Sequence, residues 1–343
     1  MRKRIEDTEY ERDYLKVRDT FLSLTSKTYP HGHEEEVLGL LPELMNDQFG
    51  NYYRIIGDRP TTMFTSHLDT ADHRQNKTER YSTIDSGIEN ITTGGETILG
   101  ADDKAGVAVM LYMIEKKVPG LYYFFIGEER GGIGSKKLAN GFEETEHVSE
   151  IVRCVSFDRR GTGSIITKQL GRQCCSDEFA NALCEQYNGL GMQMAPDPTG
   201  IFTDSAMLMG LIPECTNVSV GYMNEHTGKE VQNITHLEQL CKASCEVDWD
   251  SLPTKRDLQE AVKGDKDYPD SYNDLVKDAK KLDTFSGIEE EDGKWSLYFD
   301  LEGWKPSEVL SELQDINQLV EKHGLMGAGH MDNGYLIINI MVL

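Results

Sequence analysis

The sequence lacks the features of membrane, secreted and nucleic-acid-binding proteins. No run approaches 18 apolar residues, so no transmembrane helix is expected. Basic residues follow Met1, but no apolar segment comes after them, so no signal peptide is expected. Lys and Arg number 35 against 59 Asp and Glu, and the net charge of −24 argues against bulk attraction to nucleic acid or to an anionic membrane.

A cysteine pattern that would predict disulfides is also absent. The seven cysteines are odd in number and irregularly spaced, and Cys174 and Cys175 are adjacent rather than separated as in a CxxC motif. This pattern predicts reduced thiols and therefore a cytoplasmic protein. A chain of 343 residues is long enough for one large domain, or for one domain with a smaller one.

Apolar strands and amphipathic helices alternate through the first 250 residues. This alternation predicts an α/β domain in which helices sandwich a mostly parallel, mixed sheet. Residues 70–97 are polar and predict a hairpin or loop over one edge of the sheet, while 164–167 are expected to pair with the strand 151–157. The predicted strands are 52–56, 61–66, 121–126, 151–157 and 215–220, and the predicted helices include 10–25, one opening at Glu34 with Met45 on its buried side, one after Asp102, 176–187 and 236–247.

The composition changes after about residue 250, so we place the domains at 1–250 and 251–343. The second is predicted to be a small C-terminal α+β appendage of unknown role. Its last strand could pair across an interface, which leaves the oligomeric state open. Its predicted elements are charged helices over 254–283, an acidic turn or linker over 286–293, a strand over 295–301, an amphipathic helix over 307–323 and an apolar strand over 335–342.

Polar residues of metal-binding type follow several of the predicted strands. The carboxyl ends of parallel strands meet at one edge of a sheet, which is where sites form in such folds. Two divalent cations held close together need histidines and carboxylates, with one carboxylate bridging them. The candidates are His67, Glu128, Glu129, Asp158 and His226 after strands, with Asp102 at a helix start.

Two short motifs suit such a site. In His67-Leu68-Asp69, the histidine can bind metal while a carboxylate accepts its other N–H and fixes its tautomer. In Glu128-Glu129, one acid can bind metal while its neighbour acts as general base. Together these motifs predict hydrolytic chemistry at the sheet edge.

The sequence resembles the co-catalytic di-zinc metallopeptidase superfamily over about residues 30–245. Any one matching block is weak evidence, whereas five blocks in the right order are specific. The resemblance implies the zinc-dependent exopeptidase fold. The matching blocks are Ser66-His67-Leu68-Asp69-Thr70, Leu99-Gly100-Ala101-Asp102-Asp103-Lys104-Ala105-Gly106, Gly127-Glu128-Glu129, Phe157-Asp158-Arg159 and Asn224-Glu225-His226-Thr227.

Carried over block by block, the resemblance implies a ligand set. His67 and Asp158 would complete one metal site, and Glu129 and His226 the other. Asp102 would bridge the two. The implied cofactor is a pair of divalent metal ions per chain, with Zn²⁺ as the first choice and Co²⁺ or Mn²⁺ tolerated by the same carboxylate-rich ligands.

The resemblance also implies two catalytic residues. Asp69 would orient His67. Glu128 would be the general base that takes a proton from the attacking water and passes it to the leaving amine. His31 and His33 look like a further metal pair, but we interpret them as loop histidines before a helix.

The spacing of the blocks bears on the subgroup. The interval from His67 to Asp102 leaves no room for the extra domain of the self-compartmentalising aminopeptidases. The interval from Asp158 to His226 is too short for the lid and dimerisation domain of peptidase T and carboxypeptidase relatives. The chain therefore looks most similar to the single-domain aminopeptidases of the bacterial leucyl aminopeptidase type, although the wording Gly-Ala-Asp-Asp-Lys-Ala-Gly resembles the peptidase T group.

Four further residues are candidates for contact with a substrate. Asp204, preceded by Thr203, resembles a residue that relatives place near the pocket, or else the pair caps a helix. Arg159, like Arg160 beside it, could pair with a substrate carboxylate or lie at the surface. Tyr222 could donate to the oxyanion of a tetrahedral intermediate or simply pack in the core.

These observations predict a cytoplasmic metal-dependent exopeptidase, in the first place an aminopeptidase that releases N-terminal residues from short peptides. Two alternatives stay open. One is an amidohydrolase, deacylase or carboxypeptidase-like dipeptidase of the same fold, which Arg159 and Arg160 would favour. The other is an inactive metal-binding scaffold, against which the intact ligand set and Glu128 argue. We expect no nucleic-acid or membrane partner.

Overall fold

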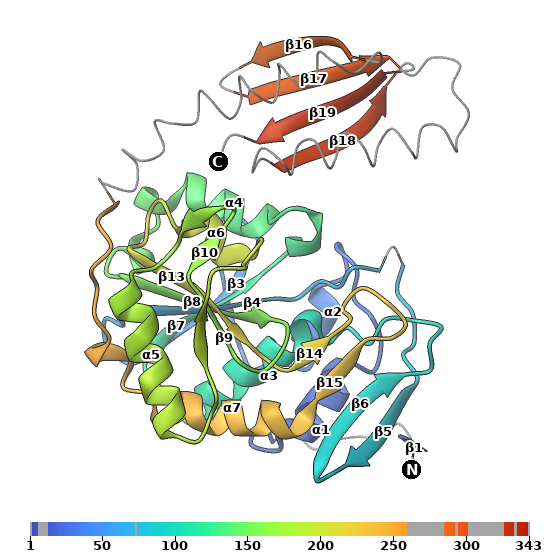
Figure 1. Cartoon of the computed structure of the whole chain (residues 1–343), viewed down its shortest axis with the longest axis vertical. Coiled ribbons are helices and arrows are strands. Elements are labelled where there is room, and N and C mark those ends of the chain that lie inside the picture. Colours follow the sequence, from blue (N-terminus) through green and yellow to red (C-terminus); the bar gives the residue numbers. More distant parts are fainter. Residues whose placement is uncertain are drawn as a thin grey trace. The chain divides into compact units, whose positions relative to one another are not determined.

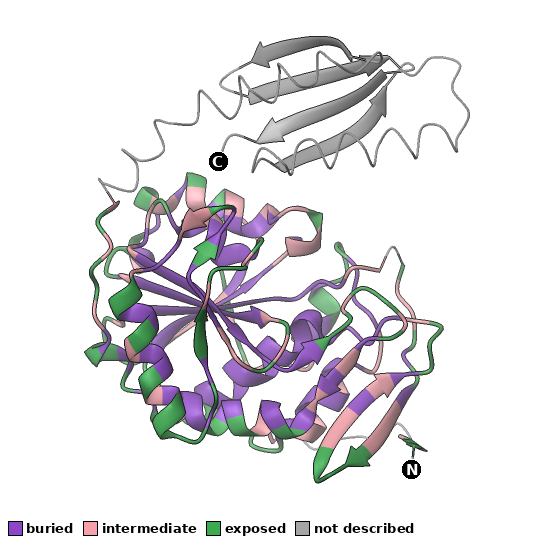
Figure 2. Ribbon diagram, in the orientation of Figure 1, coloured by how far each residue is buried: buried purple, intermediate pink, exposed green. Residues whose placement is uncertain are grey.

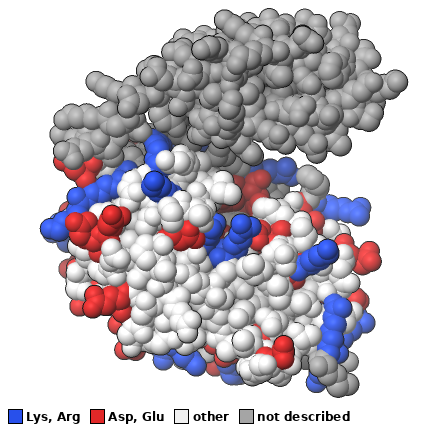
Figure 3. Space-filling view, viewed as in Figure 1, with Lys and Arg blue, Asp and Glu red and all other residues white. Residues whose placement is uncertain are grey.

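The computed structural model describes residues 2–5, 13–72, 74–258, 285–291, 294–300, 326–332 and 335–341. The chain divides into two compact units, Met1–Leu258 and Gln259–Leu343, each of which is described by itself (Figure 1). No helix in these ranges is long and apolar enough to cross a bilayer. On the face of the first unit seen in Figure 3, Lys and Arg side chains are interspersed with Asp and Glu.

An eight-stranded sheet forms the centre of the first unit, in the order β12-β9-β13-β8-β4-β7-β3-β2. Strands β13, β8, β4 and β7 pair in parallel, whereas β3 and β2 add antiparallel strands at one side. The predicted α/β fold with a mixed, largely parallel sheet is confirmed. The bounds are β2 (Met45–Asn46), β3 (Tyr52–Ile56), β4 (Thr62–His67), β7 (Gly120–Phe125), β8 (Arg153–Arg159), β9 (Ser164–Ile166), β12 (Ala195–Asp197) and β13 (Glu214–Ser219).

The central strands are buried on both faces. Every residue of β4, β7 and β13 is buried, and the run Leu-Tyr-Tyr-Phe-Phe in β7 is the continuous apolar pattern of an interior parallel strand. Figure 2 shows this layer in purple across the middle of the unit. Each fully buried Leu or Phe contributes about 1.5–3 kcal/mol, so the strand ends that carry the polar residues are rigidly held.

Helices cover both faces of the sheet (Figure 1). Helices α1, α3 and α7 pack on one face and α4 and α6 on the other, while α5 packs against β9 and β12. Helix α3 lies so close to β8 that a Cβ on Gly106 would come within 1.9 Å of the backbone oxygen of Phe157. The bounds are α1 (Val17–Leu24), α2 (Glu35–Leu38), α3 (Ala101–Glu115), α4 (Ile133–Asn140), α5 (Asp177–Gly189), α6 (Asp204–Leu208) and α7 (Ile234–Glu246).

A second sheet of five strands contains the predicted hairpin, in the order β1-β5-β6-β15-β14. Its strands pair antiparallel, and β14 and β15 flank the loop that carries His226. The bounds are β1 (Arg2–Arg4), β5 (Arg80–Asp85), β6 (Ile88–Thr93), β14 (Tyr222–Met223) and β15 (Val231–Asn233), and a short ladder joins β10 (Lys168–Gln169) to β11 (Arg172–Gln173).

Three local predictions for the first unit are corrected. Helix α1 covers only the second half of the predicted 10–25, of which 10–12 lie outside the described residues. The helix predicted from Glu34 ends at Leu38, because Pro42 cannot continue it, and Met45 is exposed in β2. Strand β9 pairs with β12 and β13 rather than with β8, because β13 occupies the position beside β8.

The second unit contains a four-stranded antiparallel sheet, in the order β16-β17-β19-β18. The predicted acidic linker 286–293 is wrong, because most of it is strand β16. Strand β19 pairs on both sides, so its predicted availability for an interface is also wrong. The helices predicted over 254–283 and 307–323 lie largely outside the described residues. The bounds are β16 (Phe285–Glu291), β17 (Lys294–Asp300), β18 (Met326–Asp332) and β19 (Tyr335–Met341).

Candidate metal centre

The predicted site residues meet where three neighbouring parallel strands end. His67 is the last residue of β4, Asp158 lies near the end of β8, and Glu128 opens a 3-10 helix just after β7. Because β4 lies between β7 and β8, these side chains start side by side. Asp102 comes from the first turn of α3, and His226 follows β14. Segments far apart in the sequence therefore converge on one point.

Four carboxylates surround the imidazole of His67. Its Nε2 lies 3.0 Å from Oδ1 of Asp102, 3.7 Å from Oδ1 of Asp158 and 3.9 Å from Oε2 of Glu128. Its Nδ1 lies 3.1 Å from the backbone oxygen and 3.4 Å from Oδ1 of Asp69. A proton on Nδ1 directed to these acceptors leaves Nε2 as the nitrogen that can bind a cation.

His226 approaches the same carboxylate from another side. Its Nε2 lies 3.1 Å from Oδ2 of Asp102 and 3.0 Å from Oε1 of Glu129. His67 faces Oδ1 of Asp102 and His226 faces Oδ2, so one carboxylate offers a separate oxygen to each histidine. This is the arrangement that a bridging ligand requires.

Two triads of donor atoms that share Asp102 fit divalent cations at this point. One triad is His67, Asp102 and Asp158, and the other is Asp102, Glu129 and His226. His67, Glu128 and Glu129 form a third group, and within each group the donor atoms lie within 4.8 Å of one another. Imidazole nitrogen and carboxylate oxygen are ligands of Zn²⁺, and three protein ligands leave a coordination position open, as in catalytic zinc sites. The crowding of buried carboxylates also favours a bound positive charge.

Burial and crowding shift the pKa values of these groups. Burial raises the pKa of Glu128 well above its usual range, and the charge of Asp158 adds to this while His67 opposes it. Burial likewise raises the pKa of Glu129 and of Asp158. The hydrogen bond to Asp102 raises the pKa of His226 to about 11. The cluster therefore holds protons that bound cations would displace.

Asp69 supports the site on two sides. In addition to its contact with His67, its buried carboxylate accepts hydrogen bonds from the backbone N–H groups of Glu128 and Glu129, each at 3.1 Å. One aspartate therefore holds both the histidine and the loop that presents the two glutamates. The orienting role toward His67 that the resemblance implies stays a prediction.

Asp158 is held by three polar side chains. Tyr222 donates from its hydroxyl to Oδ1 and to the backbone oxygen of Asp158, each at 3.0 Å, and Thr203 donates to Oδ2 at 2.6 Å. Asn217 bonds both the N–H and the C=O of Asp158 at 2.9 Å. Thr203 makes no side-chain cap to α6, which corrects that alternative, whereas the role of Tyr222 toward an oxyanion stays a prediction.

Three charged residues near the site are buried and were missed in the sequence. Asp103, joined to Asp102 by a cis peptide bond, accepts a hydrogen bond from the Ser66 hydroxyl. The ammonium group of Lys104 donates to the backbone oxygen of Leu68 at 2.6 Å. The carboxylate of Glu230 accepts backbone N–H groups of residues 99–102. The first two stand in the matched motif, whereas Glu230 is a lone acid in a polar stretch and gives no signal.

The candidate substrate residues are buried or engaged with protein groups, and Oδ1 of the buried Asp204 has no hydrogen-bond partner among the described residues. Asp204 is 1% exposed, and burial raises its pKa to about 7. The guanidinium of Arg159 lies 2.9 Å from Oγ1 of Thr199, and that of Arg160 lies 3.2 Å from Oε1 of Glu225. Their roles toward a substrate stay predictions.

The two loop histidines pair with acids at the start of α2. Nδ1 of His31 lies 2.6 Å from Oε1 of Glu34, and Nδ1 of His33 lies 2.9 Å from Oε1 of Glu36. A donor atom of Asp69 lies within 4.8 Å of the His31 pair, but both its oxygens already accept backbone N–H groups. The pairs agree with the interpretation of these histidines as loop residues.

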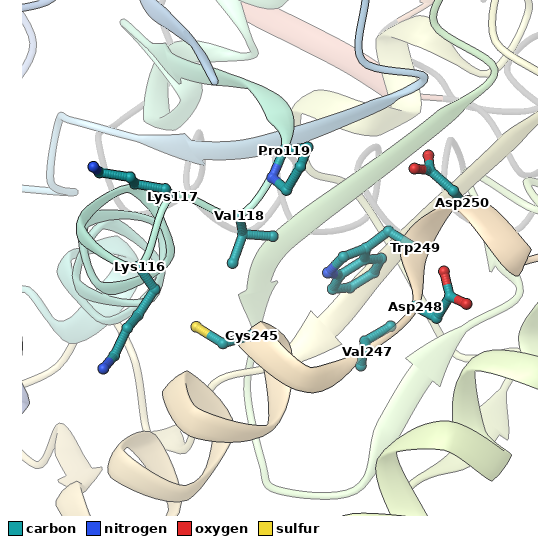
Figure 4. Close-up of a pocket in the computed structure, with 9 residues that line it drawn as sticks. All are labelled: Lys116, Lys117, Val118, Pro119, Cys245, Val247, Asp248, Trp249 and Asp250. Carbon is teal, nitrogen blue, oxygen red and sulfur yellow. The ribbon is translucent and has the colours of Figure 1, made fainter. Parts of the chain in front are cut away.

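A hollow of about 280 Å³ lies apart from this cluster, between the last turns of α3 and α7 and the start of β7 (Figure 4). In Figure 4 the ammonium groups of Lys116 and Lys117 point away from Trp249. None of the predicted site residues lines it, so the chemistry rests on the metal-binding cluster. The lining residues are Lys116, Lys117, Val118, Pro119, Cys245, Val247, Asp248, Trp249 and Asp250.

Comparison with known sequences gives limited information. No family model matches the chain. The uncharacterized protein YqjE of Bacillus subtilis is 41% identical over 87 residues, which are 23% of this chain and 22% of that protein. The chain therefore matches less than a quarter of that relative's length.

Solved structures of aminopeptidases are more informative about the fold. The aminopeptidase PepT of Bacillus cereus superposes with a TM-score of 0.55 at 17% identity, over 68% of this chain and 97% of its own. A tripeptidase of Staphylococcus aureus gives 0.52 at 17% identity, over 68% and 97%. The TET1 peptidase of Pyrococcus horikoshii gives 0.51 at 14% identity, over 67% and 98%.

The subgroup, whether beside the bacterial leucyl aminopeptidases or beside the peptidase T group, stays a prediction. Identities of 14–17% carry the fold and not the activity. The first unit, with its mixed sheet, its two helical layers and its cluster at the strand ends, has the fold of these peptidases.

Proposed function

We propose that this protein is a metal-dependent exopeptidase, and specifically an aminopeptidase that acts on short peptides. The observation that carries the proposal is the sharing of Asp102 by two ligand triads, with Glu128 beside them. The solved structures of similar fold are described as an aminopeptidase, a tripeptidase and a TET peptidase, which supports the same reaction class.

The ligand residues fit a pair of divalent ions, Zn²⁺ in the first place. His67 and Asp158 would hold one ion, Glu129 and His226 the other, and Asp102 both. When bound, such ions supply an activated water at neutral pH and polarise the scissile carbonyl. The remaining chemistry falls to the side chains of the chain itself.

Glu128 has the properties of a general base. Its Oε2 lies 3.9 Å from Nε2 of His67, which places its carboxylate beside the two triads that share Asp102 and in a further group of donor atoms with His67 and Glu129. Burial holds its pKa high, so it has the affinity for a proton that a base of the attacking water needs. The backbone bond from Glu128 N–H to Asp69 fixes the residue in place for that transfer.

The features that would favour the alternatives are weaker. Arg159 and Arg160 are the candidates for binding a substrate carboxylate, and both guanidinium groups contact protein acceptors.

All seven cysteines lie in the described part of the chain and are unpaired, which supports the proposed location in the cytoplasm.

The test combines metal analysis with substrate profiling. Metal content and hydrolysis are measured with matched free-amine and N-acetylated peptides, with and without a chelator. We expect two ions per chain and chelator-sensitive release of the first residue from free-amine peptides alone. Hydrolysis of the blocked peptides would instead indicate an amidohydrolase. Full metal occupancy without turnover of many peptides would indicate a scaffold, and no metal after zinc is added back would overturn the metal site itself.

A further inference from the structure

The buried carboxylate of Glu230 accepts four backbone hydrogen bonds in succession. Its Oε2 accepts the N–H of Leu99 at 2.6 Å and that of Gly100 at 2.9 Å. Its Oε1 accepts the N–H of Ala101 at 2.8 Å and that of Asp102 at 3.1 Å. The residue is 0% exposed, so no solvent replaces these bonds.

Only a carboxylate of this length satisfies the four donors. Each ionised oxygen accepts two hydrogen bonds, and all four acceptor positions are used. A glutamine would turn an NH₂ group toward two backbone N–H groups, whichever way the amide is placed. An aspartate is one methylene shorter and would leave some of the donors without a partner in a buried position, which is costly.

Glu230 also connects two segments that carry candidate ligands. It stands four residues after His226, and its own N–H bonds the backbone oxygen of Thr227 at 3.1 Å, which closes the turn between them. Its carboxylate reaches the segment that ends in Asp102. Asp102 and His226 belong to the same triad, and their side chains lie 3.1 Å apart.

We propose that Glu230 is a positioning residue, whose carboxylate fixes Asp102 relative to His226 and thereby sets the affinity of their shared metal site. The inference rests on the proposed metal centre and adds a residue that the ligand set does not include. It acts through the backbone, because no atom of Glu230 is among the donor atoms of the two triads. Residues that orient ligands in this way change metal affinity about 10- to 100-fold when they are lost.

Glu214 offers a matched control. It is also 0% exposed, and its carboxylate accepts the backbone N–H groups of Ser176, Lys255 and Arg256 at 2.6–3.0 Å. It is the first residue of β13, at the opposite end of the strands from the cluster. A Glu214→Gln variant therefore repeats the chemical change of Glu230→Gln away from the metal centre.

The experiment compares the wild type with Glu230→Gln and Glu214→Gln. Zinc affinity is measured by competition with a chromophoric chelator, the visible spectrum of the Co²⁺-loaded protein reports ligand geometry, and thermal unfolding of the chelated protein reports stability. We expect both variants to unfold at lower temperature. Only Glu230→Gln should weaken one of the two metal sites about 10- to 100-fold and change the cobalt spectrum.

If Glu230→Gln kept the zinc affinity and the cobalt spectrum of the wild type, the inference would be overturned. An equal loss of zinc affinity in Glu230→Gln and Glu214→Gln would also overturn it. Should Glu230→Gln not fold, Glu230→Asp keeps the charge with a shorter reach. It should show a smaller loss of affinity at the same site, and an unchanged affinity would again overturn the inference. A wild-type protein that binds no metal would instead overturn the proposed function.

Discussion

The hydroxyl group of Tyr222 lies 3.0 Å from Oδ1 of Asp158. Tyr222 is 3% exposed, so its hydroxyl finds its partner inside the protein and not in solvent. Tyr222 is the first residue of β14, whereas Asp158 lies in β8. A candidate metal ligand is thus oriented by a residue from another strand.

Replacing Tyr222 by Phe should lower metal affinity several-fold, because Asp158 loses one of the bonds that fix its carboxylate. The free energy of unfolding should fall by about 1–3 kcal/mol, since the bond serves a buried acid. Tyr187→Phe is the control, because that hydroxyl bonds Ser244 in the core, away from the cluster. The Tyr187→Phe protein should be less stable than the wild type but should bind metal with the same affinity. Unchanged metal affinity in Tyr222→Phe, with a reduced kcat, would support the role of oxyanion donor.

A Glu128→Gln variant should bind metal with nearly wild-type affinity and lose about 10²- to 10⁴-fold in kcat. The amide keeps the size of the side chain but cannot take the proton. Glu129→Gln, its neighbour, should lose metal affinity as well, since Glu129 belongs to one of the triads that share Asp102 and Glu128 does not. Metal analysis beside peptide hydrolysis separates the two variants. Near-normal turnover in Glu128→Gln would show that the base lies elsewhere.

The chelated protein should become less stable as the pH rises from about 5 to about 8. Burial raises the folded-state pKa of Asp204 from its usual 3.8 to about 7, and contact with Asp102 raises that of His226 from 6.5 to about 11. The folded state therefore holds more protons than the unfolded state across this range, and stability falls with rising pH. Urea unfolding at several pH values measures the slope.

An Asp204→Asn variant should flatten that slope below about pH 7, because one of the buried acids with a raised pKa no longer titrates. Zinc should restore stability at the upper end of the range, since the bound ions replace the protons of the cluster. A chelated wild-type protein that gains stability between pH 5 and pH 7 would contradict the assignment of these shifts.

Replacing Gly106 by Ala should reduce the free energy of unfolding by about 1–3 kcal/mol or more, although alanine usually favours a helix. Its Cβ would lie 1.9 Å from the backbone oxygen of Phe157, which cannot move without displacing β8. At Gly210 no atom lies within 4 Å of the added Cβ, so Gly210→Ala should change stability by less than about 0.5 kcal/mol. Urea unfolding measures the stability of both variants. If Gly106→Ala were as stable as Gly210→Ala, α3 would be able to shift away from β8.

The sequence predicts the central sheet well because its strands are strongly apolar. The run in β7 has one plausible location, the interior between two helical layers. Strand β16 shows the opposite case, because Glu289, Glu290 and Glu291 give it the composition of a turn. Its pairing with β17 is a tertiary interaction that overrides local propensity.

The candidate ligands could be found in the sequence because each follows a strand or opens a helix. His67 and Asp158 are examples, since neighbouring parallel strands must place them together. The supporting residues could not be found in this way. Glu230 serves backbone groups 128–131 positions away, and nothing in its own neighbourhood predicts that partner.

The shared carboxylate of Asp102 has a consequence for the order of events during synthesis. The second triad includes His226, so a nascent chain cannot complete it until that residue has left the ribosome. Before then, an ion could contact His67, Asp102, Glu129 and Asp158 but not His226, and the closing turn that Glu230 secures would still be missing. The proposed centre can therefore be completed only after most of the first unit has been translated, and a loaded centre would mark a chain whose separate ligand segments have come together.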